Sequence, residues 1–193
     1  MTRIIAGVAG GRRLQTPRGL DTRPTSDRVR EALFSALEAW SGLAGVRFLD
    51  LYAGTGAVGL EAWSRGASWV TLVESDRRTA ALITANARSI GCDLARVVAG
   101  PVAATLARGA DHGYDIVFAD PPYPLPDDDV AGDLAALVSG GWLAEDALVV
   151  VERSGRSREP RWPAGLTAQR RRRYGETTLW FATAPTGEAE ESR

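Results

Sequence analysis

The stretch Val46-Arg-Phe-Leu-Asp-Leu-Tyr-Ala-Gly-Thr-Gly-Ala-Val-Gly59 decides the fold. Its first six residues have the apolar character of a buried strand, and a helical pattern follows over residues 57–65. The glycines between them permit a tight turn, and they let backbone N–H groups and the helix N-terminus approach a ligand closely. The stretch therefore predicts a strand-loop-helix unit with a nucleotide-like ligand at the carboxyl end of the strand.

The same alternation of short apolar runs and helical stretches continues along the chain. Further strands are expected at residues 69–73, 95–98, 114–118 and 147–151, and further helices at residues 77–90, 102–108 and 127–138. Strands that alternate with helices imply right-handed crossovers and a mostly parallel sheet covered on both faces. The predicted fold class is therefore a doubly wound α/β domain.

Flanking segments complete the expected organisation. Residues 1–25, with glycines at 10 and 11 between two short apolar runs, predict a small β-hairpin ahead of the main domain, which spans residues 26–184. Ser26 is a suitable N-cap for a helix whose apolar residues are Val29, Leu33, Leu37 and Trp40. Residues 165–169 and 177–182 predict a closing antiparallel pair, and the tail over residues 185–193 is expected to be disordered.

Length and composition limit the possible classes of protein. The chain has 193 residues, of which 45% are hydrophobic and 24% charged, values that fit one globular domain and exclude a long repeat array. No apolar run is long enough to span a membrane and the N-terminus lacks the pattern of a signal peptide, so we expect a cytoplasmic protein with no membrane partner. One cysteine, Cys92, and one histidine, His112, exclude an intramolecular disulfide and argue against a metal site.

The charges are nearly balanced in number but segregated along the chain. All 23 basic residues are arginines. Residues 3–30 hold seven arginines against two aspartates, and residues 153–173 hold eight against one glutamate, whereas residues 111–133 hold seven aspartates and no arginine. This segregation predicts a polyanion-binding surface built from two distant segments. Solvated faces in an arginine-rich chain are the alternative.

Two acidic residues near the glycine loop bear on the identity of the ligand. The glycines match G-x-G-x-x-G, and Glu74 lies at the end of the next strand, where a carboxylate can accept both hydroxyls of a ribose. That pattern fits both NAD and S-adenosylmethionine (SAM). Asp50, just before the loop, would repel a pyrophosphate but suits the ammonium and sulfonium groups of SAM. An aspartate that only caps the turn is the alternative interpretation.

A second constellation, Asp120-Pro-Pro-Tyr123, follows the strand that should lie next to the first, so both loops open into one crevice. An exocyclic base amine is a poor nucleophile because its lone pair is delocalised into the ring. Methylating it requires acceptors for its hydrogens, which the Asp120 carboxylate and the Pro121 carbonyl can supply. The prolines restrict the loop, and Tyr123 offers a face for stacking the base. A turn with no chemical role is the alternative.

Three strings together resemble the RsmD-type methyltransferases: residues 50–56, residues 120–123 and the more specific Arg23-Pro-Thr-Ser-Asp-Arg-Val-Arg-Glu-Ala-Leu-Phe34. The resemblance covers nearly all of residues 3–182. It implies a class I SAM-dependent methyltransferase, with a Rossmann-like sheet of seven mostly parallel strands and an N-terminal β-hairpin that helps to bind RNA. The implied reaction is methylation of the N2 amine of one guanine, guanine 966 in the family, in 16S rRNA. Because a chain this small is not expected to read a long RNA sequence unaided, we expect its 16S rRNA partner to lie within a partly assembled small ribosomal subunit, with naked RNA as the alternative.

The resemblance also implies roles for individual residues through their positions in these motifs. The implied catalytic group is Asp120, Pro121, Pro122 and Tyr123. The residues implied at the cofactor SAM are Asp50, Tyr52, Gly54, Thr55, Gly56, Glu74, Ser75, Val102 and Asp120. Those implied at the RNA are Arg3, Arg12, Arg13, Arg23, Thr25, Arg28 and Arg173. The chain departs from the family at residues 99–102, where an acid or amide often lies near the adenine, so contacts there are expected to be apolar or through the backbone.

Three other functions compete with this interpretation. An adenine-N6 DNA methyltransferase would use the same Asp-Pro-Pro-Tyr acceptors, but the chain shows no additional domain for reading a DNA sequence. An NAD-dependent oxidoreductase would need a proton-transfer residue, and His112 is expected away from the crevice. A noncatalytic RNA-binding module with this fold would not need an intact Asp120 and Gly54. A monomer suffices for each of these functions.

Overall fold

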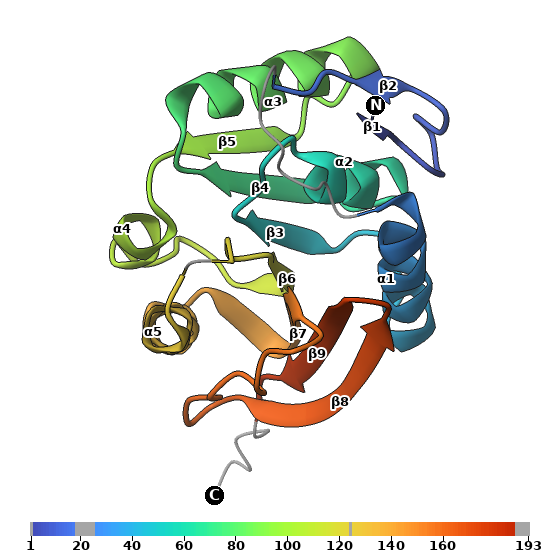
Figure 1. The fold of residues 1–193 in the computed structure, drawn as a ribbon. Helices are drawn as coiled ribbons and strands as arrows, with labels where there is room; N and C mark the ends of the chain where they lie inside the picture. Colours follow the sequence, from blue (N-terminus) through green and yellow to red (C-terminus); the bar gives the residue numbers. More distant parts are fainter. Residues whose placement is uncertain (1, 18–25, 124, 188–193) are drawn as a thin grey trace, which may run out of the picture.

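The computed structural model describes residues 2–17, 26–123 and 125–187. Arg23 and Thr25, two of the residues implied at the RNA, lie outside these ranges. Figure 1 shows the arrangement of the elements. The strands are β1 (Thr2–Arg3), β2 (Arg13–Leu14), β3 (Arg47–Leu51), β4 (Trp69–Glu74), β5 (Ala95–Ala99), β6 (Tyr114–Ala119), β7 (Leu143–Ser154), β8 (Thr167–Tyr174) and β9 (Thr177–Thr183). The helices are α1 (Asp27–Trp40), α2 (Ala57–Ser64), α3 (Arg77–Ile90), α4 (Val102–Leu106) and α5 (Asp127–Ser139).

Seven strands form one sheet in the order β5-β4-β3-β6-β7-β9-β8. The first five of these are parallel to one another, and β9 and β8 close the sheet through antiparallel pairs. The strand order reverses between β3 and β6, which are neighbours with Leu51 paired to Ala119. This arrangement confirms the predicted doubly wound sheet. It also places the two motif loops at the switch point, where such sheets bind ligands.

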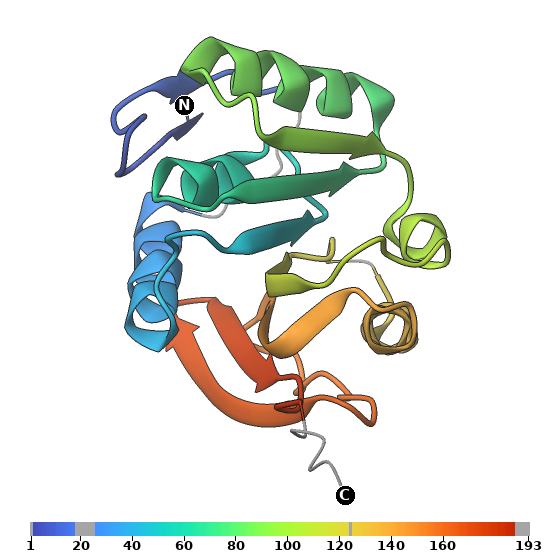
Figure 2. The same ribbon diagram turned by 180° about the vertical axis from the view of Figure 1, so that it is seen from behind.

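Helices cover both faces of this sheet, as Figures 1 and 2 show from opposite sides. On the face of α1, α2 and α3, Phe34 belongs to the same buried core as Phe48 and Phe118. On the face of α4 and α5, Leu134 shares a second core with Val149. Because successive side chains of a strand point to opposite faces, each central strand supplies both cores. The odd or even position of a strand residue therefore tells which face it occupies.

The N-terminal segment packs as part of this domain. β1 and β2 pair antiparallel, and the chain reverses between them through glycines at 7, 10 and 11. Ile4 and Leu14 are buried in the core on the α1–α3 face. Ile5 and Ala6 donate their N–H groups to the carboxylate of Glu61 in α2, at 2.6 and 2.9 Å. Residues 2–14 thus form a hairpin fastened to a helix of the main domain.

Helix α1 begins where the sequence predicts it. Ser26 Oγ accepts a hydrogen bond from the N–H of Val29 at 3.3 Å, and Val29, Leu33 and Leu37 are buried. Trp40, the last residue of the expected apolar face, is instead 39% exposed. The helix ends at this residue, and the Arg170 guanidinium lies 5.3 Å from a Trp40 ring centroid. The end of the helix therefore packs against a charged side chain of the sheet edge.

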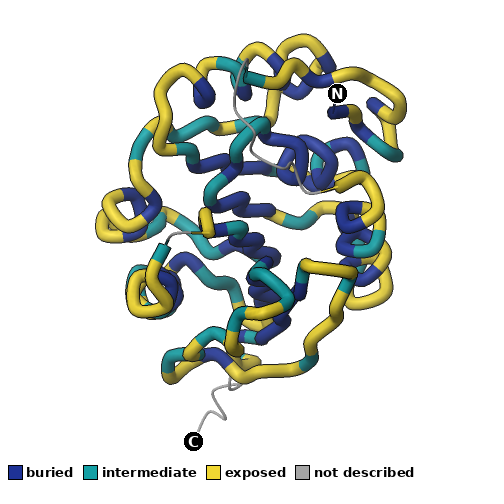
Figure 3. Tube along the Cα trace, viewed as in Figure 1, coloured by how far each residue is buried: buried dark blue, intermediate teal, exposed yellow. Residues whose placement is uncertain are grey.

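The closing antiparallel pair is confirmed, but its first strand is longer than expected. β8 continues through the arginines at 170–173, because β9 supplies partners for residues 167–168 and, after a bulge, for residues 170–174. Most of β8 is exposed (Figure 3). Part of the expected disordered tail is also held in place. The N–H of Asp146 donates to the Pro185 carbonyl at 3.2 Å, and its carboxylate accepts from Thr186 Oγ at 2.8 Å. Residues 188–193 lie outside the described ranges.

Candidate active site

The glycine loop after β3 turns sharply into α2. Gly56 is the N-cap of that helix and has a φ of +77°, a conformation that favours glycine. Gly59 allows α2 to lie close to the sheet, because a Cβ there would come within 2.7 Å of the Leu72 side chain. The structure thus explains on steric grounds why glycine occupies both positions. It also directs the N-terminus of α2 toward the carboxyl edge of the sheet.

Asp50 caps this turn with its side chain. Its side chain is 1% exposed, and its Oδ2 accepts the N–H of Gly59, in the first turn of α2, at 2.8 Å. Burial raises the pKa of Asp50 to about 8, with the Gly59 hydrogen bond opposing the shift and the negative charges of Asp120 and Glu74 adding to it. The turn-capping role, an alternative at the sequence level, is therefore real. The contact of Asp50 with a cationic ligand stays a prediction.

Glu74 lies beside the same loop, at the end of β4. Its two carboxylate oxygens accept the N–H groups of Gly54 and Asp76, at 2.9 and 2.8 Å, and Ser75 Oγ lies 3.3 Å from one of them. Glu74 is half-buried. It therefore joins the glycine loop to the loop that precedes α3, and Gly54, Ser75 and Glu74 lie together as the sequence predicts.

Four carboxylates share one face of the sheet at its carboxyl edge. Leu51 is paired with Val73 and with Ala119, and Ala119 is paired with Val151. From this register and the alternation of strand side chains, Glu74, Asp50, Asp120 and Glu152 all belong to the α1–α3 face. They lie on or, for Asp120, directly after the neighbouring strands β4, β3, β6 and β7. We call these four residues the carboxylate row. Sequence reasoning missed Glu152, whose only signal was its place just after the predicted strand 147–151.

A pocket opens at the Asp120 end of the carboxylate row. Asp120, Pro121 and Tyr123 line it from one side, and the other lining residues come from β7 and its following loop and from β9: Glu152, Arg153, Ser154, Ser157 and Thr177. Tyr123 is 77% exposed, an unusual state for a large aromatic ring. Pro121 is buried, whereas Pro122 is exposed and its carbonyl accepts the N–H of Leu125 at 2.9 Å. The pocket thus joins a carboxylate pair to an accessible aromatic face.

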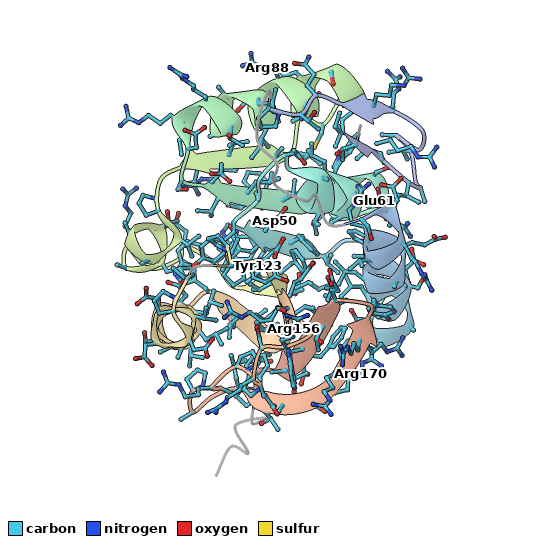
Figure 4. The ribbon with its side chains drawn as sticks, viewed as in Figure 1. Asp50, Glu61, Arg88, Tyr123, Arg156 and Arg170 are labelled. Carbon is cyan, nitrogen blue, oxygen red and sulfur yellow. The ribbon has the colours of Figure 1, made fainter. Side chains whose placement is uncertain are left out.

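A second hollow adjoins the first across Tyr123. It is lined by Tyr123, Ser154, Gly155, Arg156, Arg173 and Glu176, so two arginines share this hollow with the exposed ring. Figure 4 labels Tyr123 and Arg156. Arg173 was predicted at the RNA, whereas Arg156 was part of the basic segment without a specific role. Arg173 Nε also donates to the Gly175 carbonyl at 3.1 Å. The basic segment 153–173 therefore reaches the mouth of the pocket.

The other arginines divide into exposed and structural residues. Arg3, Arg12, Arg13 and Arg28 are exposed, on the hairpin and the first turn of α1. Arg30 is completely buried and donates to Asp27 and to the Arg3 carbonyl. Arg170 packs over the rings of Trp40 and Phe181. Polyanion binding by the exposed arginines stays a prediction, whereas Arg30 is buried inside the fold and cannot belong to such a surface.

Three residues predicted at the cofactor face other parts of the structure. The Tyr52 hydroxyl donates to Asp133 of α5, and Val102 is 4% exposed within the core on the α4–α5 face. Burial and the Asp133 hydrogen bond raise the pKa of Tyr52 above its usual range, so its hydroxyl stays a donor. The Thr55 carbonyl accepts from Asn86 Nδ2 at 3.2 Å. Cofactor contacts by these residues stay predictions.

His112, the proton-transfer candidate for an oxidoreductase, lies at the end of the sheet opposite the carboxylate row. The His112 ring lies 6.4 Å from that of Trp69 and 5.1 Å from that of Tyr114, at the amino end of β6 and therefore opposite the carboxylate row. Within the described ranges, no group of three or more histidine, cysteine, aspartate or glutamate residues could hold a metal ion. In the same part of the chain, no helix is long and apolar enough to cross a membrane.

The chain is similar in sequence and in fold to known methyltransferases. The family model described as Conserved hypothetical protein 95 matches residues 2–183. An Escherichia coli protein named Ribosomal RNA small subunit methyltransferase D is 38% identical over 175 residues, which cover 90% of this chain and 85% of that protein. The solved structure of the Escherichia coli protein yhhF has a TM-score of 0.85 and 33% identity, covering 96% of this chain and 98% of that one.

A more distant solved structure extends the likeness of the fold. The magnesium protoporphyrin IX methyltransferase ChlM from Synechocystis, with bound SAM, has a TM-score of 0.63 at 14% identity, covering 81% of this chain and 78% of that one. At this identity the likeness concerns the fold alone. Together with the strand order, it confirms the expected class I methyltransferase architecture.

Proposed function

The chain belongs to the RsmD family of methyltransferases, and we infer that it transfers a methyl group from SAM to the N2 amine of one guanine in 16S rRNA. The observation that carries this proposal is the placement of the Asp120–Tyr123 pocket beside the glycine loop. The two lie on the neighbouring strands β3 and β6, where the strand order reverses. One crevice can therefore hold the methyl donor and the acceptor base together.

The glycine-loop side of the carboxylate row suits SAM. A loop of glycines next to a helix N-terminus admits a nucleoside, and Glu74 is placed to accept its ribose hydroxyls. The acidic neighbours that raise the pKa of Asp50 give this end a negative potential. Such a potential favours a cationic cofactor and disfavours the pyrophosphate of NAD. When bound, SAM supplies an electrophilic methyl group on a sulfonium.

The Asp120 side of the carboxylate row suits the acceptor amine. A guanine flipped out of its RNA helix would stack on the exposed ring of Tyr123, and its N2 hydrogens would be accepted by the Asp120 carboxylate and the Pro121 carbonyl. These two acceptors would orient the N2 lone pair toward the methyl group of bound SAM, which would supply that methyl and leave as a neutral thioether with the electron pair of the broken C–S bond. The surplus proton on N2 leaves to Asp120 or to water.

The arginines around the pocket fit an RNA backbone. Arg156 and Arg173 lie beside Tyr123, where phosphates next to a flipped nucleotide would pass. The exposed arginines of the hairpin, with Arg28, offer further contacts, and with them we propose that the N-terminal hairpin helps to bind RNA. Contacts of this kind release counterions, so the affinity for RNA should fall steeply as salt rises. A flat response to salt would contradict this part of the proposal.

Methyl transfer to purified substrates tests the proposal. Labelled SAM is offered to small ribosomal subunits from cells lacking this protein, to naked 16S rRNA and to duplex DNA, and the modified nucleoside is identified by mass spectrometry. We expect N2-methylguanosine in subunit RNA, at guanine 966 by the family resemblance. N6-methyladenine in the DNA would instead support the adenine-directed alternative. Failure to bind SAM would contradict the cofactor assignment.

A further inference from the structure

We propose that Glu152 selects guanine by accepting the N1–H of the target base, while Asp120 accepts from its N2 amine. This inference rests on the proposed function and adds a specificity-determining residue to it. Glu152 lies at the carboxyl end of β7 and lines the same pocket as Asp120, Pro121 and Tyr123. It is 8% exposed, so any polar group that meets it does so largely out of water.

The register of the strands places the two carboxylates next to each other. Ala119 of β6 is paired with Val151 of β7, so Asp120 and Glu152 each follow a paired residue and belong to the same face. Neighbouring strands lie about 4.8 Å apart. Two carboxylates at this spacing can meet two adjacent donors on the edge of one base.

The pattern along β7 singles out this position. Leu148 and Val150, the preceding residues on the same face, are apolar and almost completely buried. Glu152 therefore interrupts an apolar pattern at the point where the strand reaches the pocket. A carboxylate at this position adds a hydrogen-bond acceptor to the lining of the pocket.

The hydrogen-bonding groups on the base edges explain how this pair of carboxylates would select guanine over adenine. Guanine presents two donors side by side, N1–H and the N2 amine, whereas adenine presents an N1 acceptor beside its N6 amine. An ionised carboxylate can only accept hydrogen bonds. Asp120 and Glu152 together match two adjacent donors, and with adenine the N1 lone pair would face the Glu152 carboxylate. The same Asp-Pro-Pro-Tyr motif can thus serve guanine here.

A base analogue and a matched substitution test this role. Small subunits are reconstituted with guanine or with 2-aminopurine at the target position. The analogue keeps the N2 amine but has an unprotonated N1. We expect wild-type kcat/KM to be at least about 100-fold lower on 2-aminopurine, because a buried site built to accept an N–H rejects a base that lacks it. In Glu152→Gln the amide can donate to N1 of the analogue, and this ratio should fall to about tenfold or less.

Controls make each outcome decisive. Glu145→Gln removes the same charge from an exposed position near the other end of β7 and should keep the wild-type ratio. A Glu152→Gln protein that binds SAM normally yet keeps the wild-type ratio would overturn the inference. So would a wild-type enzyme that methylates 2-aminopurine as well as guanine, a result that needs no variant to fold. A wild-type enzyme that makes no N2-methylguanosine would overturn the proposed function itself, and this inference with it.

Discussion

Glu61, within α2, and Asp50, at the carboxyl end of β3, are both carboxylates with almost no exposed surface, yet their surroundings differ (Figure 4). Glu61 is surrounded by donors and cations: the N–H groups of Ile5 and Ala6, Arg65 Nε at 2.7 Å and the Arg30 guanidinium at 3.9 Å. Asp50 accepts one backbone N–H, from Gly59, and its charged neighbours include Asp120 and Glu74.

The difference separates a carboxylate whose charge is neutralised inside the fold from one that we propose to lie at a ligand site. A buried charge is tolerated when donors and opposite charges surround it, as they surround Glu61. The negative charge of Glu61 is therefore neutralised inside the fold, where it fastens the N-terminal hairpin to α2. At the carboxylate row, burial and the negative charges of Asp120 and Glu74 raise the pKa of Asp50, and in our proposal a bound cation would offset the repulsion among these charges. The same residue type thus stabilises the fold in one region and prepares a site in the other.

Replacing Glu61 with alanine should have the largest effect on stability. The change removes the acceptor of Arg65 Nε and of two backbone N–H groups, and it removes the buried negative charge that faces Arg30, so the free energy of unfolding should fall by about 3–5 kcal/mol. Urea denaturation measures this loss in the free energy of unfolding. Glu38→Ala is the matched control, because Glu38 is the half-exposed partner of Arg65 and should contribute less than about 1 kcal/mol. Equal losses in the two variants would contradict the structural role of Glu61.

Replacing Asp120 with alanine should affect turnover rather than stability. Loss of the acceptor for the amine hydrogens should slow methyl transfer by about 100–1000-fold, while the thermal unfolding temperature stays close to that of the wild type. Single-turnover transfer to small subunits measures the rate. Asp111→Asn, an exposed aspartate before β6, provides a control that should leave the rate unchanged. Normal turnover of Asp120→Ala would remove Asp120 from the reaction.

Replacing Asp50 with asparagine should change how stability depends on pH. Asp50 binds a proton in the folded state up to about pH 8, whereas the unfolded chain releases it near the ordinary value of 3.8. Between about pH 4 and pH 8, Asp50 therefore binds fewer protons in the unfolded state than in the folded state. The titration of Asp50 thus makes the free energy of unfolding of the wild type fall as pH rises through this range. The free energy of unfolding of Asp50→Asn should fall less over that range. Urea denaturation at a series of pH values tests it, and identical slopes in the two proteins would contradict the raised pKa.

Replacing Ser64 with alanine should have the smallest effect of this set. Ser64 Oγ accepts the N–H of Ala9 at 2.9 Å and donates to the Ala6 carbonyl at 2.6 Å, so it fastens the same hairpin as Glu61 without a charge. Its loss should lower the free energy of unfolding by about 1–3 kcal/mol. Hydrogen exchange at the Ala9 amide should speed up as well. An unchanged exchange rate would mean that the backbone alone holds the hairpin.

The local parts of the fold could be predicted because their signals are local. The glycine loop lies between a strand pattern and a helix pattern, and Ser26 precedes a run with helical spacing, so both elements follow from neighbouring residues. The partners of Glu61 could not be predicted, because Ile5 lies 56 residues away and neither segment carries a sequence signal for contact with the other. The strand structure of the arginine run in β8 could not be predicted either, because it depends on pairing with β9.

The candidate site divides in the same way. Gly54, Glu74 and Asp120 could be found from motifs, because the chemistry requires those residue types at those places. Glu152 could not, because its role depends on the register that sets it beside Asp120 across two strands. The capping by Asp50 likewise depends on how closely α2 approaches the sheet, a distance that the motif itself does not specify.

Calorimetric titration of SAM into Glu74→Gln and Asp120→Ala tests most directly whether the carboxylate row has a cofactor half and a base half. Loss of a charged acceptor for the ribose should weaken binding of SAM to Glu74→Gln by about 10–100-fold. Asp120→Ala should bind SAM within about threefold of the wild type, because Asp120 acts on the base amine. Normal binding by Glu74→Gln, or an equal loss in both variants, would contradict the division of the row.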